Sequence, residues 1–419
     1  MHAPGGRVQS ICFAVGGPAR DRRMMNAPVI ASFSADSDAP PVSESWRPLP
    51  AARPEERRLA WLCSVGLRRS AVPAPASSET VDWQRLGTIA RRHRVMPLIW
   101  RNLRARPDME MPAEIAGQFR EAARQNAANA LRLTSHLVRI VSTLTAAGIR
   151  VLPLKGIALA ARYYPDVAAR HAGDIDLLVA PENMDRADVI LRGMGYHRVT
   201  NTTHVWAQAP FTEDTDYRLH FIYMSPDGVL IELHFRLHNN PEILPVDVDD
   251  ILADSVPVRL GSVDMPAMSD ELQFVFLATH GARHEWVRLQ WVCDIAVMVD
   301  RATTEEVRQW LATAARFGLA NPVAQALVIA RHLLGIELPP EVSRAYAGSW
   351  RIRYMVRRAE CLLLKSADSK TDGPSPAFNP GRRLYRMCVS GRPSYLLAEV
   401  RDGLKALSAR LAKPAPRLS

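Results

Sequence analysis

Two short apolar runs of the chain carry isolated carboxylates in a pattern that is typical of β-strands. Residues 173–179 read Gly-Asp-Ile-Asp-Leu-Leu-Val, and residues 229–234 read Val-Leu-Ile-Glu-Leu-His. Side chains two positions apart in a strand point to the same face, so Asp174 and Asp176 project together. Aspartate is a poor strand former, and these two carboxylates together with Glu232 would repel one another unless a divalent cation lay between them. The pattern therefore predicts strands whose carboxylates converge on a two-metal phosphoryl-transfer site.

A lysine–glycine step precedes the carboxylates. Residues 151–156 read Val-Leu-Pro-Leu-Lys-Gly, so Lys155 and Gly156 follow one strand-like run and open a helical one. Glycine permits close approach of the backbone, and the start of a helix offers free N–H groups to a phosphate. Lys155 is also the only lysine in the first 364 residues, and its compact ammonium group suits a phosphate tail. Because the spacing of a P-loop is absent, the step predicts a phosphate-binding turn of another kind.

Two further polar residues are spaced to reach the same site. Arg170 lies four residues before Asp174 and would pair with a phosphate or with the acidic cluster, while a structural ion pair is the competing interpretation. His234 shares a strand face with Glu232, two residues away. This position favours either a substrate contact or a histidine whose hydrogen bonds are satisfied inside the protein.

A later segment places aromatic and charged residues at helical spacing. His280, His284 and Arg288 fall at i, i+4 and i+8, Trp291 continues that stripe, and Asp294 lies close to it. The stripe would face the active cleft or form a buried, hydrogen-bonded helix pair. Two histidines four residues apart also suit a metal, but no third ligand is evident nearby and the second histidine of an H-E-x-x-H motif is missing.

The composition excludes some classes of protein. The 419 residues suffice for a sizeable core, and no apolar run approaches the roughly 18 residues of a membrane span. The net charge is +10, but 48 of the 53 basic residues are arginine, which reflects a GC-rich genome more often than nucleic-acid binding. Five scattered cysteines without a C-x-x-C pair argue against a zinc site and against a disulfide framework. We therefore expect a cytoplasmic protein without membrane association.

Composition and hydrophobic periodicity divide the chain into five regions. Residues 1–50 are rich in Ala, Pro, Ser, Gly and Arg without periodicity, which predicts a disordered segment. The remaining regions are a helical region at 51–148, a catalytic core at 149–265, a C-terminal helical domain at 266–365, and a linker with a basic, partly helical tail at 366–419. Apolar residues at helical spacing, interrupted by Asn126, predict one long helix from Pro112 to Ala147.

Strands alternate with helices in the core. Strands are expected at residues 150–154, 174–179, 197–202, 217–224 and 229–235, and helices at 157–164 and 183–194. Ser225-Pro226-Asp227-Gly228 is a strong hairpin turn signal and places Glu232 on the second strand of a hairpin. A capped helix opens at Ser269, and further helices are expected at residues 286–300, 304–317, 322–334, 341–347 and 351–365.

Taken together, these motifs resemble the uncharacterised bacterial nucleotidyltransferase family, which belongs to the polymerase-beta-like nucleotidyltransferase superfamily. The resemblance spans roughly residues 134–299 and rests on Leu154-Lys155-Gly156, Tyr164-Pro165, Arg170, residues 174–179, Gly195-Tyr196, residues 231–234, and the segment from His280 to Asp294. It implies an α+β fold with a mixed β-sheet and flanking helices, preceded and followed by helical regions. Gly156 precedes Asp174 by 18 residues, a spacing nearer to the toxin-type members with a Lys-Gly turn than to the common Gly-Ser turn of the superfamily.

The resemblance implies a metal-dependent enzyme that moves a nucleoside monophosphate from an NTP to an acceptor and releases pyrophosphate. The catalytic residues, which would also bind two Mg²⁺ or Mn²⁺ ions, would be Asp174, Asp176 and Glu232. The nucleotide-binding residues would be Lys155, Gly156 and Arg170. The candidates for contacts in the substrate pocket are His234, His280, His284, Arg288 and Asp294.

Two alternatives stay open at this point. A glycosyltransferase that uses an Asp-x-Asp motif on a nucleotide-sugar explains the two aspartates, but it explains neither Glu232 nor the Lys155-Gly156 turn. A catalytically silent nucleotide-binding module is the other alternative. The acceptor would be a small molecule, a peptide, a protein or an RNA end. Neither the base preference, the oligomeric state, the true start codon nor the role of the basic tail can be read from the residues.

Overall fold

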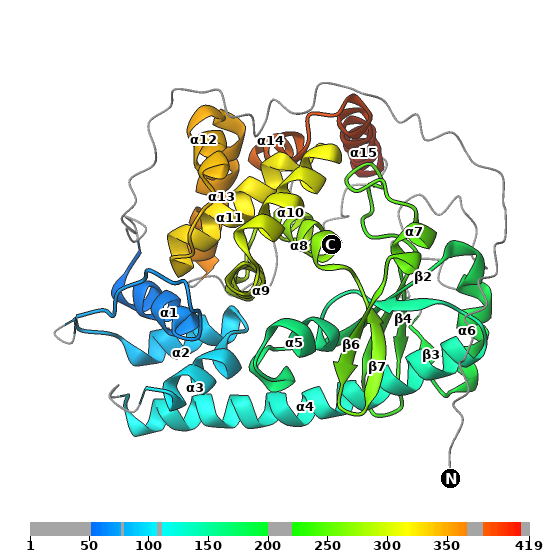
Figure 1. Cartoon of the computed structure of the whole chain (residues 1–419), viewed down its shortest axis with the longest axis horizontal. Coiled ribbons are helices and arrows are strands. Elements are labelled where there is room, and N and C mark those ends of the chain that lie inside the picture. Colours follow the sequence, from blue (N-terminus) through cyan, green and yellow to red (C-terminus); the bar gives the residue numbers. More distant parts are fainter. Residues whose placement is uncertain (1–51, 77–78, 107–110, 200–219, 367–379, 412–419) are drawn as a thin grey trace, which may run out of the picture.

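The computed structural model describes residues 52–76, 79–106, 111–199, 220–366 and 380–411 (Figure 1). Helices account for 62% and strands for 10% of the described residues. A mixed sheet is flanked by helices, and further helices precede and follow it, which confirms the predicted α+β class. The predicted disordered segment at the N-terminus, most of the predicted linker, and the facing ends of two predicted strands lie outside the described residues. The region boundaries drawn from the sequence stay a prediction.

Four helices form the first part of the described chain. They are α1 (Pro54–Ser64), α2 (Trp83–Arg92), α3 (Met96–Arg104) and α4 (Ala113–Ala146). Helix α4 has 34 residues. At 1.5 Å per residue it is therefore about 50 Å long. It contacts α2 and α3 near its beginning and the central sheet near its end, so it links the two parts of the molecule (Figure 1).

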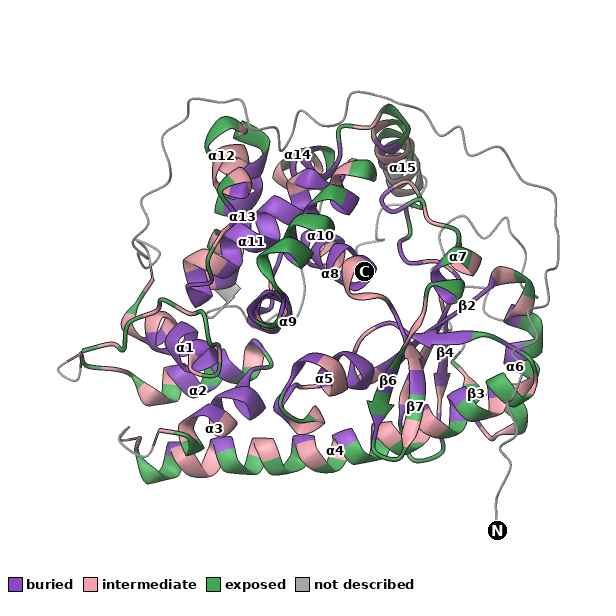
Figure 2. Ribbon diagram, in the orientation of Figure 1, coloured by how far each residue is buried: buried purple, intermediate pink, exposed green. Residues whose placement is uncertain are grey.

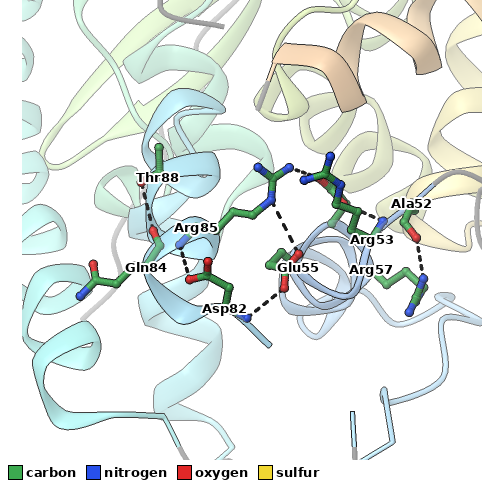
Figure 3. A network of polar contacts seen from close by, with 9 residues as sticks. Ala52, Arg53, Glu55, Arg57, Asp82, Gln84, Arg85 and Thr88 are labelled. Carbon is green, nitrogen blue, oxygen red and sulfur yellow. Dashed lines mark hydrogen bonds and ion pairs between the residues drawn. The ribbon is translucent and has the colours of Figure 1, made fainter. Parts of the chain in front are cut away.

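A polar network joins α1 to α2 (Figure 3). Asp82 caps α2 by accepting a hydrogen bond from the main-chain N–H of Arg85 at 2.9 Å, and its own N–H donates to the Glu55 carboxylate of α1 at 2.9 Å. The Arg85 guanidinium reaches the same carboxylate, with Nε 3.7 Å from Oε2 of Glu55. These contacts hold the two helices against each other across the intervening loop.

The central sheet contains five strands within the described residues, in the order β1-β2-β5-β4-β3. The strands are β1 (Val151–Pro153), β2 (Asp174–Val179), β3 (His197–Arg198), β4 (His220–Met224) and β5 (Leu230–His234). Strands β2 and β5 pair in parallel, and the other neighbours pair antiparallel. The predicted hairpin turn between β4 and β5 is confirmed, with Gly228 at a φ of 84°.

The connections around these strands include both predicted and unpredicted elements. Helical connections are α5 (Ile157–Tyr163), the 3₁₀ helices η2 (Val167–Ala169) and η3 (Pro181–Asn183), and α6 (Met184–Gly193). Beyond β5 follow α7 (Val248–Ala253) and an antiparallel pair, β6 (Val256–Leu260) and β7 (Val263–Ala267), which the local residue pattern did not predict. Pro257 lies opposite Pro266 in this pair, and proline weakens a strand signal because it cannot donate to a ladder.

The C-terminal part is helical, as predicted. Its helices are α8 (Asp270–Arg283), α9 (Leu289–Arg301), α10 (Thr304–Arg316), α11 (Ala320–Leu334), α12 (Pro340–Gly348), α13 (Trp350–Ser366), α14 (Pro380–Val389) and α15 (Pro393–Leu411). Figure 2 shows α8, α9 and α11 largely buried, and α11 packs against α8, α9 and α13 at the centre of this part. Within the described residues, no helix combines the length and the apolar character needed to cross a membrane.

The predicted helix over residues 286–300 is wrong at its start, because α9 begins only at Leu289. Glu285 and Trp286 adopt positive φ values of 53° and 54°, which are uncommon for residues with a Cβ. The Trp286 indole is fully buried against Gly281, and the Glu285 carboxylate pairs with one arginine of α13 and one of α14. These tertiary contacts offset the backbone strain of the two positive φ values, which residues with a Cβ disfavour locally.

We expect Gly281→Ala to destabilise the protein by about 1–3 kcal/mol, because overpacking a buried site forces side chains or backbone to shift. A Cβ at this position would lie 2.5–2.6 Å from three ring atoms of Trp286. Urea unfolding followed by circular dichroism measures the free energy of unfolding. Gly117→Ala in α4 is the matched control, because a Cβ there meets nothing within 4 Å. Equal stability of the Gly281 variant and the native protein would show that the indole can move aside.

Candidate functional site

A cavity of about 290 Å³ lies between the central sheet and the C-terminal helices. Its walls come from the turn between β1 and α5, the loop before β2, strands β4 and β5, and helices α8 and α9. The volume is close to the lower end of the ~300–1,000 Å³ typical of small-molecule sites. Among the residues that the sequence singled out, the lining includes Lys155, Gly156, Arg170, Asp174, Glu232, His234, His280 and His284.

Strands β2 and β5 bring the three predicted carboxylates together at this cavity. Their parallel register puts Asp176 opposite Glu232, and Asp174 shares the face of Asp176 two residues away. Asp174 and Glu232 line the cavity, whereas the side chain of Asp176 is fully buried. Ile175 turns to the other face and joins the core cluster of the sheet. The alternation expected from the sequence is therefore present at the site.

The turn after β1 aims Lys155 at the carboxylates. The Lys155 ammonium nitrogen lies 3.1 Å from Oδ1 of Asp176. Gln273 of α8 donates to the Leu154 carbonyl at 3.1 Å and thereby anchors the turn from the C-terminal side. Gly156 has a φ of 68°, a conformation that favours glycine. Burial alone would lower the pKa of Lys155, but the surrounding carboxylates outweigh it and raise the pKa above its ordinary value.

His234 bridges two of the carboxylates. Its Nε2 lies 3.2 Å from Oδ1 of Asp176 and 3.3 Å from Oε2 of Glu232. Burial opposes the charged imidazole, but hydrogen bonds to both carboxylates raise the pKa of His234 above its ordinary value. Burial also opposes the Asp176 charge, while Lys155 and His234 together lower the pKa of Asp176 well below its usual range. Asp174 differs, because burial and the Asp176 charge raise its pKa.

The donor set of this cluster fits divalent cations. Three carboxylates converge, and the buried Oδ2 of Asp176 has no hydrogen-bond partner among the described residues. Lys155 and His234 supply positive charge beside this carboxylate. Oxygen donors of this kind suit Mg²⁺ and Mn²⁺, and an ion here would relieve the mutual repulsion of Asp174 and Asp176.

Three side-chain amides hold the loop of residues 168–172, which leads into β2. Asn126 and Asn129 of α4 donate to carbonyl oxygens of this loop at 2.8 Å each, and Gln290 of α9 donates to a third at 2.7 Å. Asn126 therefore interrupts the apolar stripe of α4 because its side chain holds this loop. The amides tie the approach to Asp174 to helices on both sides of it.

Arg170, Asp294 and Arg288 take part in polar contacts within the protein. Arg170 borders the cavity, but its Nε and Nη2 donate to the two carboxylate oxygens of Asp294 at 2.8 and 2.9 Å. This bidentate contact is the structural ion pair that the sequence offered as the competing interpretation of Arg170. Asp294 is fully buried and also accepts from Tyr164 at 2.8 Å. Arg288 donates to the main-chain carbonyl of Arg92, so neither Asp294 nor Arg288 lines the cavity.

An aromatic wall faces the carboxylates from α8 and α9. The ring centroids of His280 and His284 lie 4.7 Å apart, and those of Trp291 and the two histidines are separated by 5.4 and 5.3 Å. These three residues do not lie on one helix, because α8 ends at Arg283 and the turn described above separates it from α9. Burial lowers the pKa of His284 to about 3 and that of His280 well below its usual value, so both rings are neutral at pH 7.

Arg283 is a cavity residue that sequence reasoning missed. It lines the cavity from the last turn of α8, and it forms no hydrogen bond or ion pair with any residue that the structure describes. Burial lowers its pKa, the charges of Arg386 and Arg382 lower it further, and Glu232 across the cavity opposes this effect. No spacing rule distinguishes this arginine from the other 47 in the chain, so only the tertiary structure identifies it.

A comparison with protein-family models finds one whose description is uncharacterised nucleotidyltransferase. It matches residues 79–335, which is more than half of the chain and includes every element that lines the cavity. No protein of established function in the curated collections of sequences matches the chain.

Proposed function

The chain belongs to the uncharacterised nucleotidyltransferase family, and on that premise we propose that it transfers a nucleoside monophosphate from an NTP to an acceptor and releases pyrophosphate. The observation that carries the proposal is the parallel register that sets Asp176 opposite Glu232, with Asp174 on the same face and all three beside Lys155. We further propose that Mg²⁺ or Mn²⁺ is required, because the donor set consists of carboxylate oxygens.

In the proposed reaction, a hydroxyl oxygen of the acceptor attacks the α-phosphorus, and the bond from this phosphorus to the oxygen shared with the β-phosphate breaks. Asp174 and Asp176 would hold the metal ions, and Glu232 would complete the metal site and favour removal of the acceptor proton. A bound metal ion would neutralise negative charge on the transferring group and on the leaving pyrophosphate. Buried Asp176 keeps its charge at neutral pH, since Lys155 and His234 lower its pKa.

The triphosphate would lie between Lys155 and Arg283. Both side chains line the cavity, one from the turn after β1 and the other from the last turn of α8. We propose Arg283 for the role that the sequence analysis gave to Arg170, because Arg170 is held by Asp294. The neutral wall of His280, His284 and Trp291 would receive a planar group of the nucleotide or acceptor.

We expect Arg283→Gln to raise the KM for the NTP about 10–100-fold with a smaller change in kcat, because a charged hydrogen bond to phosphate contributes about 1.5–3 kcal/mol. Steady-state pyrophosphate release over a range of NTP concentrations measures both constants. Arg259→Gln is the control, since Arg259 pairs with Asp264 on the surface of the small β6–β7 sheet. An unchanged KM in the Arg283 variant contradicts its contact with the triphosphate.

The proposed function is tested with the purified full-length chain, Mg²⁺ or Mn²⁺, each NTP labelled at the α-phosphate, and a lysate of the host as acceptor pool. Label that moves to an acceptor with the native protein, but not with the Asp174→Ala/Asp176→Ala variant, supports nucleotidyl transfer and identifies the acceptor class. Absence of both transfer and pyrophosphate with a folded protein would overturn the proposal. Hydrolysis of a nucleotide-sugar would then indicate a glycosyltransferase, and nucleotide binding without turnover would indicate a binding module.

A further inference from the structure

His220 adjoins the carboxylate site and has no place in the proposed reaction. His220 of β4 lies directly opposite His234 of β5 in the antiparallel register, so their imidazoles share one face of the sheet. Glu232 lies two residues from His234 and shares that face. One ligand atom from each of these three residues falls within 4.8 Å of the others. The pairing of β4 with β5 therefore gathers two imidazoles and a carboxylate at one point.

The distances within this group suit a single small ion. Oε2 of Glu232 lies 3.3 Å from Nε2 of His234 and 3.8 Å from Nδ1 of His220, and the two ring centroids are 4.7 Å apart. Two ligands that each lie about 2.1 Å from a tetrahedral ion are roughly 3.4 Å from each other. The observed spacings therefore need only small side-chain adjustments to surround an ion.

One proposed ligand atom of the group has no hydrogen-bond partner among the described residues. Nδ1 of His220 is buried and has no hydrogen-bond partner among the described residues, and it points toward Glu232 at 3.8 Å. His234 is almost fully buried, yet its Nε2 is directed at two carboxylates instead of at a main-chain group. Buried polar groups without partners are uncommon in folded proteins, and an ion that binds at Nδ1 of His220 would satisfy it.

We propose that His220, Glu232 and His234 form a binding site for a transition-metal ion of the Zn²⁺ class. Imidazole nitrogens favour ions such as Zn²⁺ and Co²⁺ over Mg²⁺, which prefers oxygen ligands. Three protein ligands leave a fourth position open toward the cavity for water or a substrate group. The scattered cysteines of the chain have no part in this site, because its donors are nitrogen and oxygen.

The proposed ion site goes beyond the proposed function. It rests on that function only because Glu232 belongs to both groups of residues. The carboxylates of Asp174 and Asp176 offer oxygen ligands alone, whereas the second group offers two nitrogens and one oxygen. The cavity would therefore distinguish two classes of ion at neighbouring positions. Ion binding at the second group is measured without nucleotide, so its outcome does not depend on whether nucleotidyl transfer occurs.

The test is a titration of the metal-free, full-length protein with Co²⁺, whose visible absorption reports nitrogen and oxygen coordination, followed by displacement with Zn²⁺. We expect one Co²⁺ to bind the native protein with a tetrahedral-type spectrum that Zn²⁺ abolishes. His220→Gln should weaken Co²⁺ binding at least tenfold. Asp174→Asn should leave both the spectrum and the affinity unchanged, because Asp174 belongs to the other ligand set.

The matched control is His171→Gln, since His171 lines the same cavity outside the ligand group. This variant should bind Co²⁺ as the native protein does. Circular dichroism of every variant establishes that it is folded, and His234→Gln provides a second loss-of-ligand variant. A folded native protein without a Co²⁺ spectrum, or a His220 variant that binds Co²⁺ with native affinity, would overturn the proposal. Loss of binding on Asp174→Asn would also overturn it, because the ion would then lie on the carboxylates.

Discussion

Asp176→Asn is expected to lower the rate of pyrophosphate release by about 10³-fold at saturating NTP and Mg²⁺, because electrostatic stabilisation of the transferring group is the largest contribution to this chemistry. The carboxylate lies opposite Glu232 in the sheet and is fully buried, so no other side chain can take its position. The amide keeps the shape of the side chain and removes its charge. Initial rates of pyrophosphate release measure the effect.

The control for this variant is Asp264→Asn, which makes the same chemical change on a strand outside the cavity. Asp264 is on β7 and pairs with Arg259 on the surface, so the variant should retain native activity. Pyrophosphate release by Asp176→Asn within tenfold of the native rate would contradict the assignment of Asp176 as a metal ligand.

The two aspartates should also differ in stability when no metal is present. Lys155 and His234 lower the pKa of Asp176, so its charged form stabilises the fold above the ordinary pKa of 3.8, and this contribution is lost as the pH falls. For Asp174 the pKa is raised by burial and by the Asp176 charge, so its stabilising contribution is present at low pH and is lost as the pH rises. At pH 7, Asp176→Asn should therefore lower the Tm of the metal-free protein, whereas Asp174→Asn should not.

Asp294→Ala is expected to lower the free energy of unfolding by about 3–5 kcal/mol, because removal of one partner leaves a buried charge uncompensated. Asp294 is fully buried and accepts two hydrogen bonds from the Arg170 guanidinium and one from the Tyr164 hydroxyl. Arginine side chains are not deprotonated in proteins, so the Arg170 guanidinium stays charged in the variant after its carboxylate partner is removed. Urea unfolding at neutral pH measures the loss.

The double variant Arg170→Met/Asp294→Ala separates the unpaired charge from the lost packing. If the uncompensated guanidinium causes most of the loss, the double variant should be more stable than Asp294→Ala alone. A double variant that is less stable than Asp294→Ala would instead show that the methylene groups and the loop before β2 account for the loss.

The strand and the turn that carry the site lie where the local sequence patterns predicted them. Strand β2 begins at Asp174 and ends at Val179, as expected from the sequence, and the turn at residues 225–228 places Glu232 on the second strand of a hairpin. Strand alternation and turn chemistry act over a few residues, so they can be read from the chain directly. The β6–β7 pair and the turn around Trp286 were missed because proline and positive φ values oppose the local preferences.

The partners of the charged residues could not be read in this way. Arg170 and Asp294 lie 124 positions apart in the chain, and no local signal pairs them, because many other acidic residues were equally available. Arg283 lines the cavity only because the tertiary structure brings the end of α8 to the same cavity as Glu232. His220 reaches His234 only through the register of β4 on β5.

The sequence by itself determined the strand with two aspartates, the hairpin with Glu232 and the turn with Lys155, because each depends on residues adjacent in the chain. Only the tertiary structure decided that β2 and β5 pair in parallel, that Arg170 is engaged by Asp294, and that Arg283 borders the cavity. The physical reason is that burial, ion pairing and ligand geometry depend on which distant segments pack together. That packing is a property of the whole core and of no single segment.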